Sequence, residues 1–372
     1  MLALVLPLVI FAVSQVVASS GAVAAGGPLV FIHGIKGAKL ADAAGNPVWI
    51  TGAQALGLRT PELSLPLTWT DGTQGRDAIS PQGVLTEVSV IPVLVRDRVY
   101  GPWMEAARKM DRPFHPFFYD WRRDNLETVA GFEKFLEFIR AKYPGQKIRV
   151  VAHSMGGLVT MAVLNRNPGW FEKVFFAGVP FRGGIGFLVD LHAGEPAGLN
   201  RKLLAPEVLF TFPSVYTLFQ QGESRLVDEN GAPVPMDFYR AKDWRSNRLG
   251  VFAESSTSSS DRDGERERFL ETALEHGRRF RAMLKPRPGA KDYPPVVVIS
   301  GKEHPTLSRA MRGGPKSVRG WDFETLPKES GDGRIRAADA LPPDGIPYHV
   351  FFSRNEHSDL LNDPEVIAII RE

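Results

Sequence analysis

The 372-residue chain contains no cysteine. Disulfide bonds, cysteine-ligated zinc and thiol catalysis are therefore excluded. The chain also lacks a strong charge of one sign, because 45 Lys and Arg residues offset 42 Asp and Glu residues and leave a net charge of +3. Without a clustered basic stripe, this balance argues against a nucleic-acid partner. The remaining composition, 43% hydrophobic and 23% charged, is that of a globular protein long enough to bury a core without covalent staples.

Long hydrophobic runs are scarce, and the clearest one lies at the amino terminus. Residues 2–13 are almost unbroken apolar, and Ala22-Val23-Ala24 follows them. An apolar stretch before an Ala-x-Ala site predicts a signal peptide over residues 1–24, cleaved after about Ala24. The run is short for a membrane span, which needs ~20 apolar residues. No Lys or Arg precedes the run, so an uncleaved anchor is the alternative, and we expect export to the periplasm or the outside.

Strand and helix patterns alternate along the rest of the chain. Short apolar runs typical of buried strands occupy Pro28–His33, Phe114–Tyr119, Ile148–Ala152, Val174–Val179, Pro295–Ser300 and Ile346–Phe352. Helical spacing of apolar residues covers Leu126–Tyr143 and Gly156–Asn165, and Asp363-Pro364 predicts the start of a last helix. The alternation predicts an α/β fold with a mostly parallel central sheet and helices on both faces.

Two stretches interrupt this alternation and predict excursions from the sheet. Residues 49–96 are rich in Gly, Pro and Leu without a clear period, and residues 184–291 contain helices and Pro-rich turns. The predicted organisation is therefore a first core part over 25–184 that includes the excursion 49–96, a cap or lid insertion over 185–290, and a last core part over 291–372.

The strongest chemical motif is Ala152-His153-Ser154-Met155-Gly156, placed between a predicted strand and a predicted helix. A serine at such a strand–turn–helix junction is exposed by a strained backbone, a geometry called a nucleophile elbow. The residues two positions away must be small because strand and helix nearly collide there. We interpret Ser154 as a catalytic serine, with the backbone N–H of Met155 as one donor of an oxyanion hole.

A serine nucleophile of this kind needs a histidine base and an acid, which follow it in the order Ser, acid, His. His357 lies in a loop between the last strand and the last helix and is the preferred base. His349 within the strand, His276 in a charged and solvated helix, and His304 are the alternatives. Asp332, flanked by glycines in a late loop, is the preferred acid; the competing carboxylates are Asp344, Asp339 and Asp359.

Several motifs together resemble the lecithin:cholesterol acyltransferase and phospholipid:diacylglycerol acyltransferase group of α/β-hydrolases. Tyr119-Asp120-Trp121-Arg122 resembles a Tyr-Asp-Trp-Arg signature of that group, and Pro213–Leu218 is similar to its Pro-Ser-x-Tyr-x-Leu stretch. Gly331-Asp332-Gly333 resembles its Gly-Asp-Gly-Thr-Val acid motif, although Arg334 and Ile335 replace Thr-Val here. The likeness extends from Pro28 to Ile370.

The resemblance implies an α/β-hydrolase fold with an inserted cap and a triad of Ser154, Asp332 and His357. The loop after the first strand, Phe31–Gly37, supplies the second oxyanion donor in this fold, and the resemblance assigns it to the N–H of Ile35. Asp120, Trp121 and Arg122 would be structural, and His33 is expected to brace its loop.

The expected function is that of a serine-dependent lipid acyltransferase or lipase that requires no metal or cofactor. It would form an acyl-enzyme from a lipid ester and pass the acyl group to an alcohol or water. The first alternative is a secreted esterase or lipase acting on other esters. The second is an inactive lipid-binding protein. The apolar segment 49–69 predicts either contact with a membrane surface or ordinary core.

Overall fold

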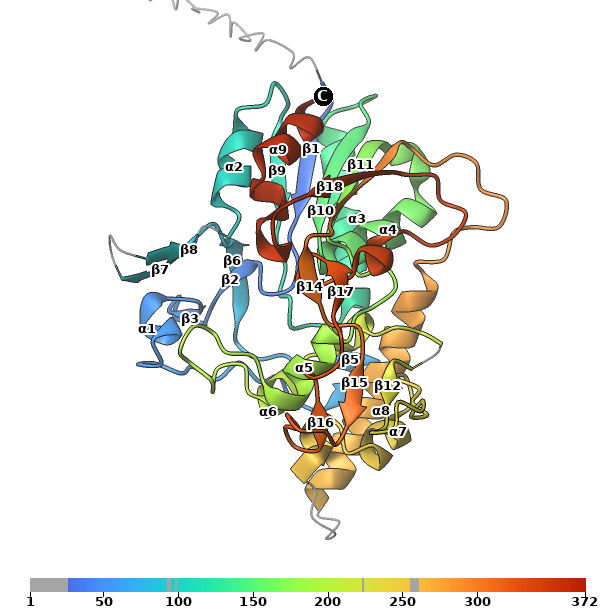
Figure 1. Cartoon of the computed structure of the whole chain (residues 1–372). Coiled ribbons are helices and arrows are strands. Elements are labelled where there is room, and N and C mark those ends of the chain that lie inside the picture. Colours follow the sequence, from blue (N-terminus) through green and yellow to red (C-terminus); the bar gives the residue numbers. More distant parts are fainter. Residues whose placement is uncertain (1–25, 92–94, 98, 223, 255–260) are drawn as a thin grey trace, which may run out of the picture.

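The computed structural model describes residues 26–91, 95–97, 99–222, 224–254 and 261–372. Within these residues, six parallel strands form the central sheet in the order β18-β13-β11-β10-β1-β9 (Figure 1). Their bounds are β1 Leu29–Ile32, β9 Phe114–Phe117, β10 Ile148–His153, β11 Phe171–Ala177, β13 Val296–Gly301 and β18 His349–Ser353.

Helices cover both faces of this sheet because alternate residues of each strand point to opposite sides. In β1, Leu29 and Phe31 pack with α2 (Gly101–Arg108) and α9 (Pro364–Arg371) in one apolar cluster. Val30 and Ile32 pack with α3 (Asn125–Lys142) and α4 (Met155–Arg166) in the other. All four β1 residues are fully buried, so the strand is apolar throughout, as a doubly covered parallel strand must be.

The predicted α/β architecture is confirmed, and the predicted strands and helices fall within a few residues of the observed ones. The last strand begins at His349, later than the predicted Ile346, because residues 343–348 form a loop. The last helix begins as expected: the Asp363 carboxylate accepts a hydrogen bond from the Glu365 N–H, and Pro364 occupies the first helical position.

The first excursion begins at β2, earlier than the predicted residue 49, and is built from short antiparallel pieces. β2 pairs with β3 and β6, and separate hairpins join β4 to β5 and β7 to β8. The elements are β2 Ala38–Ala41, β3 Pro47–Trp49, α1 Gly52–Ala55, β4 Trp69–Thr70, β5 Thr73–Gln74, β6 Ser80–Val84, β7 Val88–Ile91 and β8 Val95–Asp97. Within the segment 49–69, Trp49, Leu63 and Leu65 are core residues, whereas Leu58 is 75% exposed.

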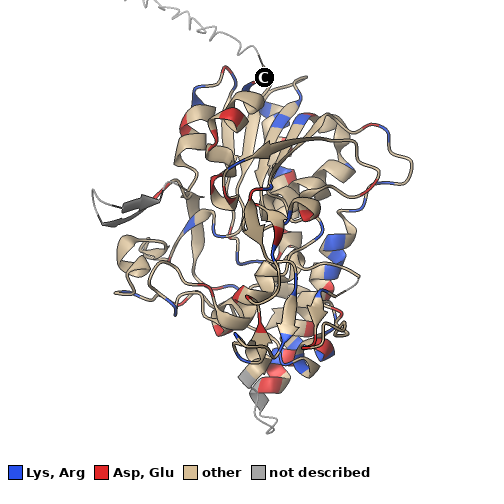
Figure 2. Cartoon of the chain, in the orientation of Figure 1, with Lys and Arg blue, Asp and Glu red and all other residues tan. Residues whose placement is uncertain are grey.

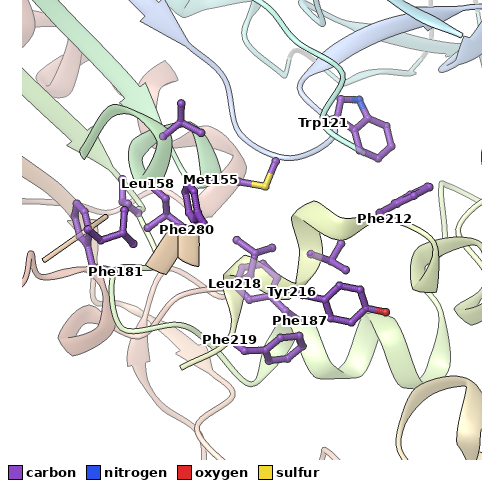
Figure 3. Packing of buried hydrophobic residues seen from close by; sticks show 14 of the residues in the cluster. Trp121, Met155, Leu158, Phe181, Phe187, Phe212, Tyr216, Leu218, Phe219 and Phe280 are labelled. Atoms are coloured by element: carbon purple, nitrogen blue, oxygen red, sulfur yellow. The ribbon is translucent and has the colours of Figure 1, made fainter. Parts of the chain in front are cut away.

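The second excursion is a mostly helical region that packs against the amino-terminal half of the fold. Its elements are α5 Gly186–Ala193, α6 Pro206–Phe210, η2 Pro213–Leu218, β12 Leu226–Val227, α7 Ala241–Ser246, η3 Gly250–Glu254 and α8 Asp261–Ala282. Figure 3 shows Phe187, Phe212 and Tyr216 of this region in one apolar cluster with Trp121 and Met155. The excursion therefore shares its hydrophobic core with the sheet domain.

Trp121 and Arg122 anchor this junction, and both side chains are fully buried. The Arg122 guanidinium pairs with Asp120 at 2.7 Å and with Asp77 at 2.6 Å, and it also donates to the Leu63 carbonyl oxygen. The Trp121 ring packs edge-on against Phe212. These contacts tie the segment after β9 to both excursions, which is what the expected structural role requires.

The chain after α8 returns to the sheet at β13 and then adds short elements, of which β15 and β16 form a separate small sheet with β12 of the second excursion. These are β14 His304–Thr306, β15 Ala310–Arg312, β16 Trp321–Asp322, β17 Glu329–Gly331, η4 Ala337–Ala340 and η5 His357–Asn362, with η1 Pro168–Trp170 earlier in the chain. β14 pairs with β17, and β15 pairs with β12 and β16. The β14–β17 pair ends directly before Asp332.

Charged residues gather on helices and loops around a mostly uncharged sheet (Figure 2). In the described part of the chain, no helix combines the length and the apolar character needed to cross a membrane. The predicted signal peptide, residues 1–24, lies outside the described residues, so export stays a prediction.

Candidate active site

Ser154 occupies the tight turn between β10 and α4. Its backbone has φ 51° and ψ −126°, a region that side-chain-bearing residues rarely adopt. The Ser154 N–H donates to the Ala177 carbonyl oxygen at the end of β11, at 2.8 Å. Neighbouring β-structure thereby holds the strained turn, and the serine side chain stands at the carboxyl edge of the sheet.

Small residues are obligatory around this turn. A Cβ atom at Gly156 would lie 2.3 Å from the His33 carbonyl oxygen. A Cβ atom at Gly34 would lie 2.7 Å from the Cβ of Ser154. The loop after β1 therefore approaches the serine backbone as closely as glycine permits.

His357 lies beside Ser154 at the start of η5, just beyond β18. Its Nε2 is 3.0 Å from the Ser154 Oγ, and its Nδ1 is 2.8 Å from the Asp332 Oδ2. The His357 backbone N–H also donates to the Asp332 carbonyl oxygen at 2.9 Å. The structure thus brings together the three side chains that the sequence singled out, in a hydrogen-bonded row from carboxylate to imidazole to hydroxyl.

The Asp332 carboxylate is almost completely buried, with 1% of the residue exposed. Burial favours the neutral acid, but the interaction with His357 and the N–H groups of Ile335 and Arg334 outweigh it. These contacts hold the pKa of Asp332 below its ordinary value. The carboxylate is therefore ionised at neutral pH and holds the His357 proton on Nδ1.

The competing carboxylates have other partners. Asp344 is exposed and pairs with Arg182, whereas Asp339 is buried between Arg225 and Arg336. Asp359 accepts a hydrogen bond from the Asn362 side chain. Among the described contacts, Asp332 alone of the four candidates reaches the His357 ring.

The other histidines lie in different surroundings. His276, expected to be solvated, is instead 7% exposed, and its Nδ1 lies 2.5 Å from the Asp124 carboxylate. The expectation was wrong because α8 packs its His276 face against the amino-terminal cap of α3. His349 is exposed at the start of β18, and the His304 Nε2 lies 2.7 Å from the Arg354 carbonyl oxygen.

The two predicted oxyanion donors come from two segments: Met155 directly follows Ser154, and Ile35 lies in the loop after β1. Met155 is the first residue of α4, where helical N–H groups have no intrahelical acceptor. Ile35 follows Gly34 in the loop after β1 and lines the same cavity as Ser154. His33 is fully buried and stacks on Tyr119, and its Nδ1–H donates to the Gly34 carbonyl oxygen at 2.7 Å.

Tyr100 and His153 form a second hydrogen-bonded row that the sequence analysis missed. The Gly34 N–H donates to the Tyr100 hydroxyl at 3.1 Å, and that hydroxyl lies 2.7 Å from the His153 Nδ1. The His153 Nε2 lies 2.9 Å from the His357 carbonyl oxygen. Because a carbonyl only accepts, the His153 Nε2 carries the proton, and the Tyr100 O–H donates to the Nδ1.

Burial keeps both members of this row neutral. Desolvation, followed by the charge of His357, lowers the pKa of His153 to about 3, and burial raises the pKa of Tyr100. The row links the loop after β1 to the backbone of His357 across the β10 strand end. The sequence signal was a histidine directly before the serine, but its partner lies 53 residues away.

A cavity of about 660 Å³ opens over Ser154. Its apolar walls include Trp49, Ile50, Leu85, Phe187 and Leu204. Charged side chains of Lys36, Glu195, Arg334 and Glu356 also line it. Lys36 pairs with Glu195, and Arg334 pairs with Asp190 of α5. Among the described residues, no cluster of three or more His, Asp or Glu side chains could hold a metal ion.

Replacing Tyr100 with phenylalanine tests the second row. The change leaves the buried Gly34 N–H and the His153 ring without their partner, so we expect the free energy of unfolding to fall by about 1–3 kcal/mol. Urea unfolding followed by circular dichroism measures it. Tyr348→Phe, at a partly exposed position, is the control and should change stability by less than ~0.5 kcal/mol. Equal stability of Tyr100→Phe and the wild type would contradict the assigned row.

Comparison with known proteins agrees with the fold described above. A family model described as the alpha/beta hydrolase family matches residues 29–332. A chain of the Tle4–Tli4 complex superposes with a TM-score of 0.60 at 15% identity, covering 93% of this chain and 98% of that one. The likeness at this identity concerns the fold.

Two sequence relatives match over shorter stretches. An uncharacterized protein of Saccharomyces cerevisiae is 24% identical over 237 residues, which is 63% of this chain and 35% of the relative. Lecithin-cholesterol acyltransferase-like 4 of Arabidopsis thaliana is 30% identical over 116 residues, which is 27% of this chain and 22% of the relative. The matches therefore span only about a third or less of these relatives. The family model, in contrast, matches residues 29–332, which is most of this chain. The chain therefore belongs to the alpha/beta hydrolase family.

Proposed function

We propose that this hydrolase is a serine-dependent lipase or lipid acyltransferase, which moves the acyl group of a lipid ester to water or to an alcohol. The observation that carries the proposal is the hydrogen-bonded row Asp332–His357–Ser154 at the floor of an open cavity. Three groups in this order and at these distances supply a nucleophile, a base and an orienting carboxylate.

Acylation begins when the His357 Nε2 takes the Ser154 hydroxyl proton. The serine oxygen then attacks the ester carbonyl carbon, and the negative charge passes to the carbonyl oxygen. We assign the N–H groups of Met155 and Ile35 to this oxyanion, each contributing on the order of 3 kcal/mol to the barrier reduction. Asp332 holds the imidazole in the required tautomer and stabilises the imidazolium that forms.

Collapse of this intermediate breaks the bond to the leaving alcohol, which takes the proton from the His357 Nε2. Water or a second alcohol next gives its proton to His357 and attacks the acyl-Ser154 ester. The second collapse returns that proton to the Ser154 oxygen, so the enzyme is regenerated. Hydrolysis and transfer use the same groups and differ only in the acceptor that enters the cavity.

A lipid substrate is supported by the cavity and its rim. The apolar walls suit an acyl chain, and Leu58 and Leu199 are each 75% exposed. The Leu199 N–H donates to the Ala55 carbonyl oxygen at 2.7 Å, so the two leucine-bearing segments meet at the cavity, which Ala55 and Gly198 line. Exposed apolar side chains at a cavity mouth are suited to contact with a lipid surface. The short match to the plant acyltransferase-like protein points the same way.

A second candidate function is hydrolysis of small soluble esters. The observation that favours it is the charged part of the cavity lining, where Lys36, Glu195 and Arg334 line the same cavity as the serine. Charged walls suit a polar ester better than two long acyl chains. Catalysis without a lipid surface, and no rate gain on vesicles, would support this reading.

The triad is tested with hydrolysis of p-nitrophenyl butyrate. Ser154→Ala and His357→Ala should lower kcat by on the order of 10⁶. Asp332→Asn should lower it by ~10⁴, because the His357 ring is then no longer held in the tautomer with its proton on Nδ1. Asp344→Asn removes an exposed carboxylate from a similar Asp-Gly turn and should leave kcat unchanged. Loss of activity in Asp344→Asn with a silent Asp332→Asn would overturn the acid assignment.

The lipid surface contact is tested with the double variant Leu58→Asp/Leu199→Asp. Charge at both positions opposes docking, so we expect fatty-acid release from phospholipid vesicles to fall about tenfold or more. The kcat for p-nitrophenyl butyrate should stay unchanged. Phe138→Asp, at a 60% exposed position on α3, is the matched control. If the double variant and the control degrade vesicles equally fast, these leucines do not form the contact.

A further inference from the structure

A second cavity of about 670 Å³ lies beneath the carboxyl end of α8. Its walls come from the segments that follow β11 and η2, the region around β12, the connection between β14 and β15, and residues from β17 to the loop after η4. In the described part of the chain it shares no lining residue with the cavity over Ser154. The proposed acyl-transfer chemistry therefore makes no use of it.

The lining of this cavity is strongly basic. Two acidic residues, Glu329 and Asp344, face six cationic ones: Arg182, Arg225, Arg281, Lys285, Arg309 and Arg336. Figure 2 shows basic residues gathered at the carboxyl end of α8, which borders the cavity. Such a concentration contrasts with a whole-chain net charge of only +3.

Three of the six cations have carboxylate partners that account for them. Arg225 and Arg336 both hold Asp339, each at 2.7 Å, and Arg336 also pairs with Glu329. Arg182 pairs with Asp344 at 2.9 Å. These pairs build the wall of the cavity and leave little positive charge for a ligand.

The other three, Arg281, Lys285 and Arg309, have no ion pair among the described residues. Arg281 is only 7% exposed, so its charge is buried. Its guanidinium donates to the carbonyl oxygens of Pro180 at 3.3 Å and Phe181 at 2.5 Å. Carbonyl oxygens satisfy N–H groups, but they do not neutralise a cation.

Burying a guanidinium without a counter-charge destabilises the fold, because no ionic interaction offsets the loss of its hydration. Burial accordingly lowers the pKa of Arg281. An anion in the cavity would supply the missing charge. Lys285 and Arg309 are exposed on its rim, where they can add further charge-assisted hydrogen bonds.

We propose that this cavity binds an organic phosphate, with Arg281, Lys285 and Arg309 as its recognition residues. Two guanidinium groups and an ammonium group suit a phosphate with several acceptor oxygens. The volume lies in the range of ligand pockets of about 300–1,000 Å³ and exceeds what a bare phosphate ion fills. The phosphate can belong to a soluble molecule or to a lipid headgroup, since both present the same group.

The test measures binding to the full chain with two probes. Isothermal titration calorimetry with inorganic pyrophosphate detects a soluble source. Flotation with phosphatidylcholine vesicles, with and without phosphatidic acid, detects a headgroup source. In the double variant Lys285→Gln/Arg309→Gln, we expect binding of the recognised probe to weaken about tenfold or more, since two charged contacts are lost. Both side chains are exposed, so the fold survives, and thermal unfolding verifies it.

The matched control is Arg279→Gln/Lys291→Gln, which removes two exposed cations outside the cavity lining. Pyrophosphate binding that the first double variant loses and the control keeps supports a soluble ligand. Recruitment only to vesicles with phosphatidic acid, with the same variant pattern, supports a lipid headgroup. Binding of neither probe, or equal binding by both double variants, overturns the proposal. Ester hydrolysis is not a readout here, so failure of this site leaves the acyl-transfer proposal untouched.

Discussion

The left-handed backbone of Ser154 is the constraint on which the site depends. A residue with a side chain adopts φ 51° only when its surroundings hold it there, and three segments do so. The end of β11 accepts the Ser154 N–H, the loop after β1 presses Gly34 against the serine, and α4 starts at the next residue. The loops after β10, β1 and β18 meet at this edge because carboxyl ends of parallel strands lie together.

This convergence explains which features could be predicted from the sequence. Buried parallel strands such as β1 and β10 are apolar on both faces, and a local motif marks the elbow at Ser154. His357 was preferred because a loop between a strand and a helix can swing its ring over the sheet edge. Asp332 was preferred among four candidate carboxylates because glycines flank it in a late loop, and its contact with His357 agrees with that preference. The contact itself joins residues 25 positions apart, so no local motif encodes it.

Other features depend on partners far apart in the chain, and they escaped prediction. In the sequence, His276 lies in a charged helix and was expected to be solvated. In the fold, α8 packs it against Asp124, which lies 152 residues earlier in the chain. The row from Gly34 through Tyr100 and His153 joins three segments, none of which marks the others in sequence. Likewise, the cations around the second cavity are scattered from Arg182 to Arg336, so only the fold gathers them.

The most direct measurement of the central claim is covalent labelling of the full chain with a fluorophosphonate, located by peptide mass spectrometry. The reagent reacts with a serine only where a base and an oxyanion hole activate it. The account predicts one adduct, on Ser154, and none in Ser154→Ala. An adduct on a different serine, or an unlabelled folded protein even with phospholipid vesicles present, would contradict it.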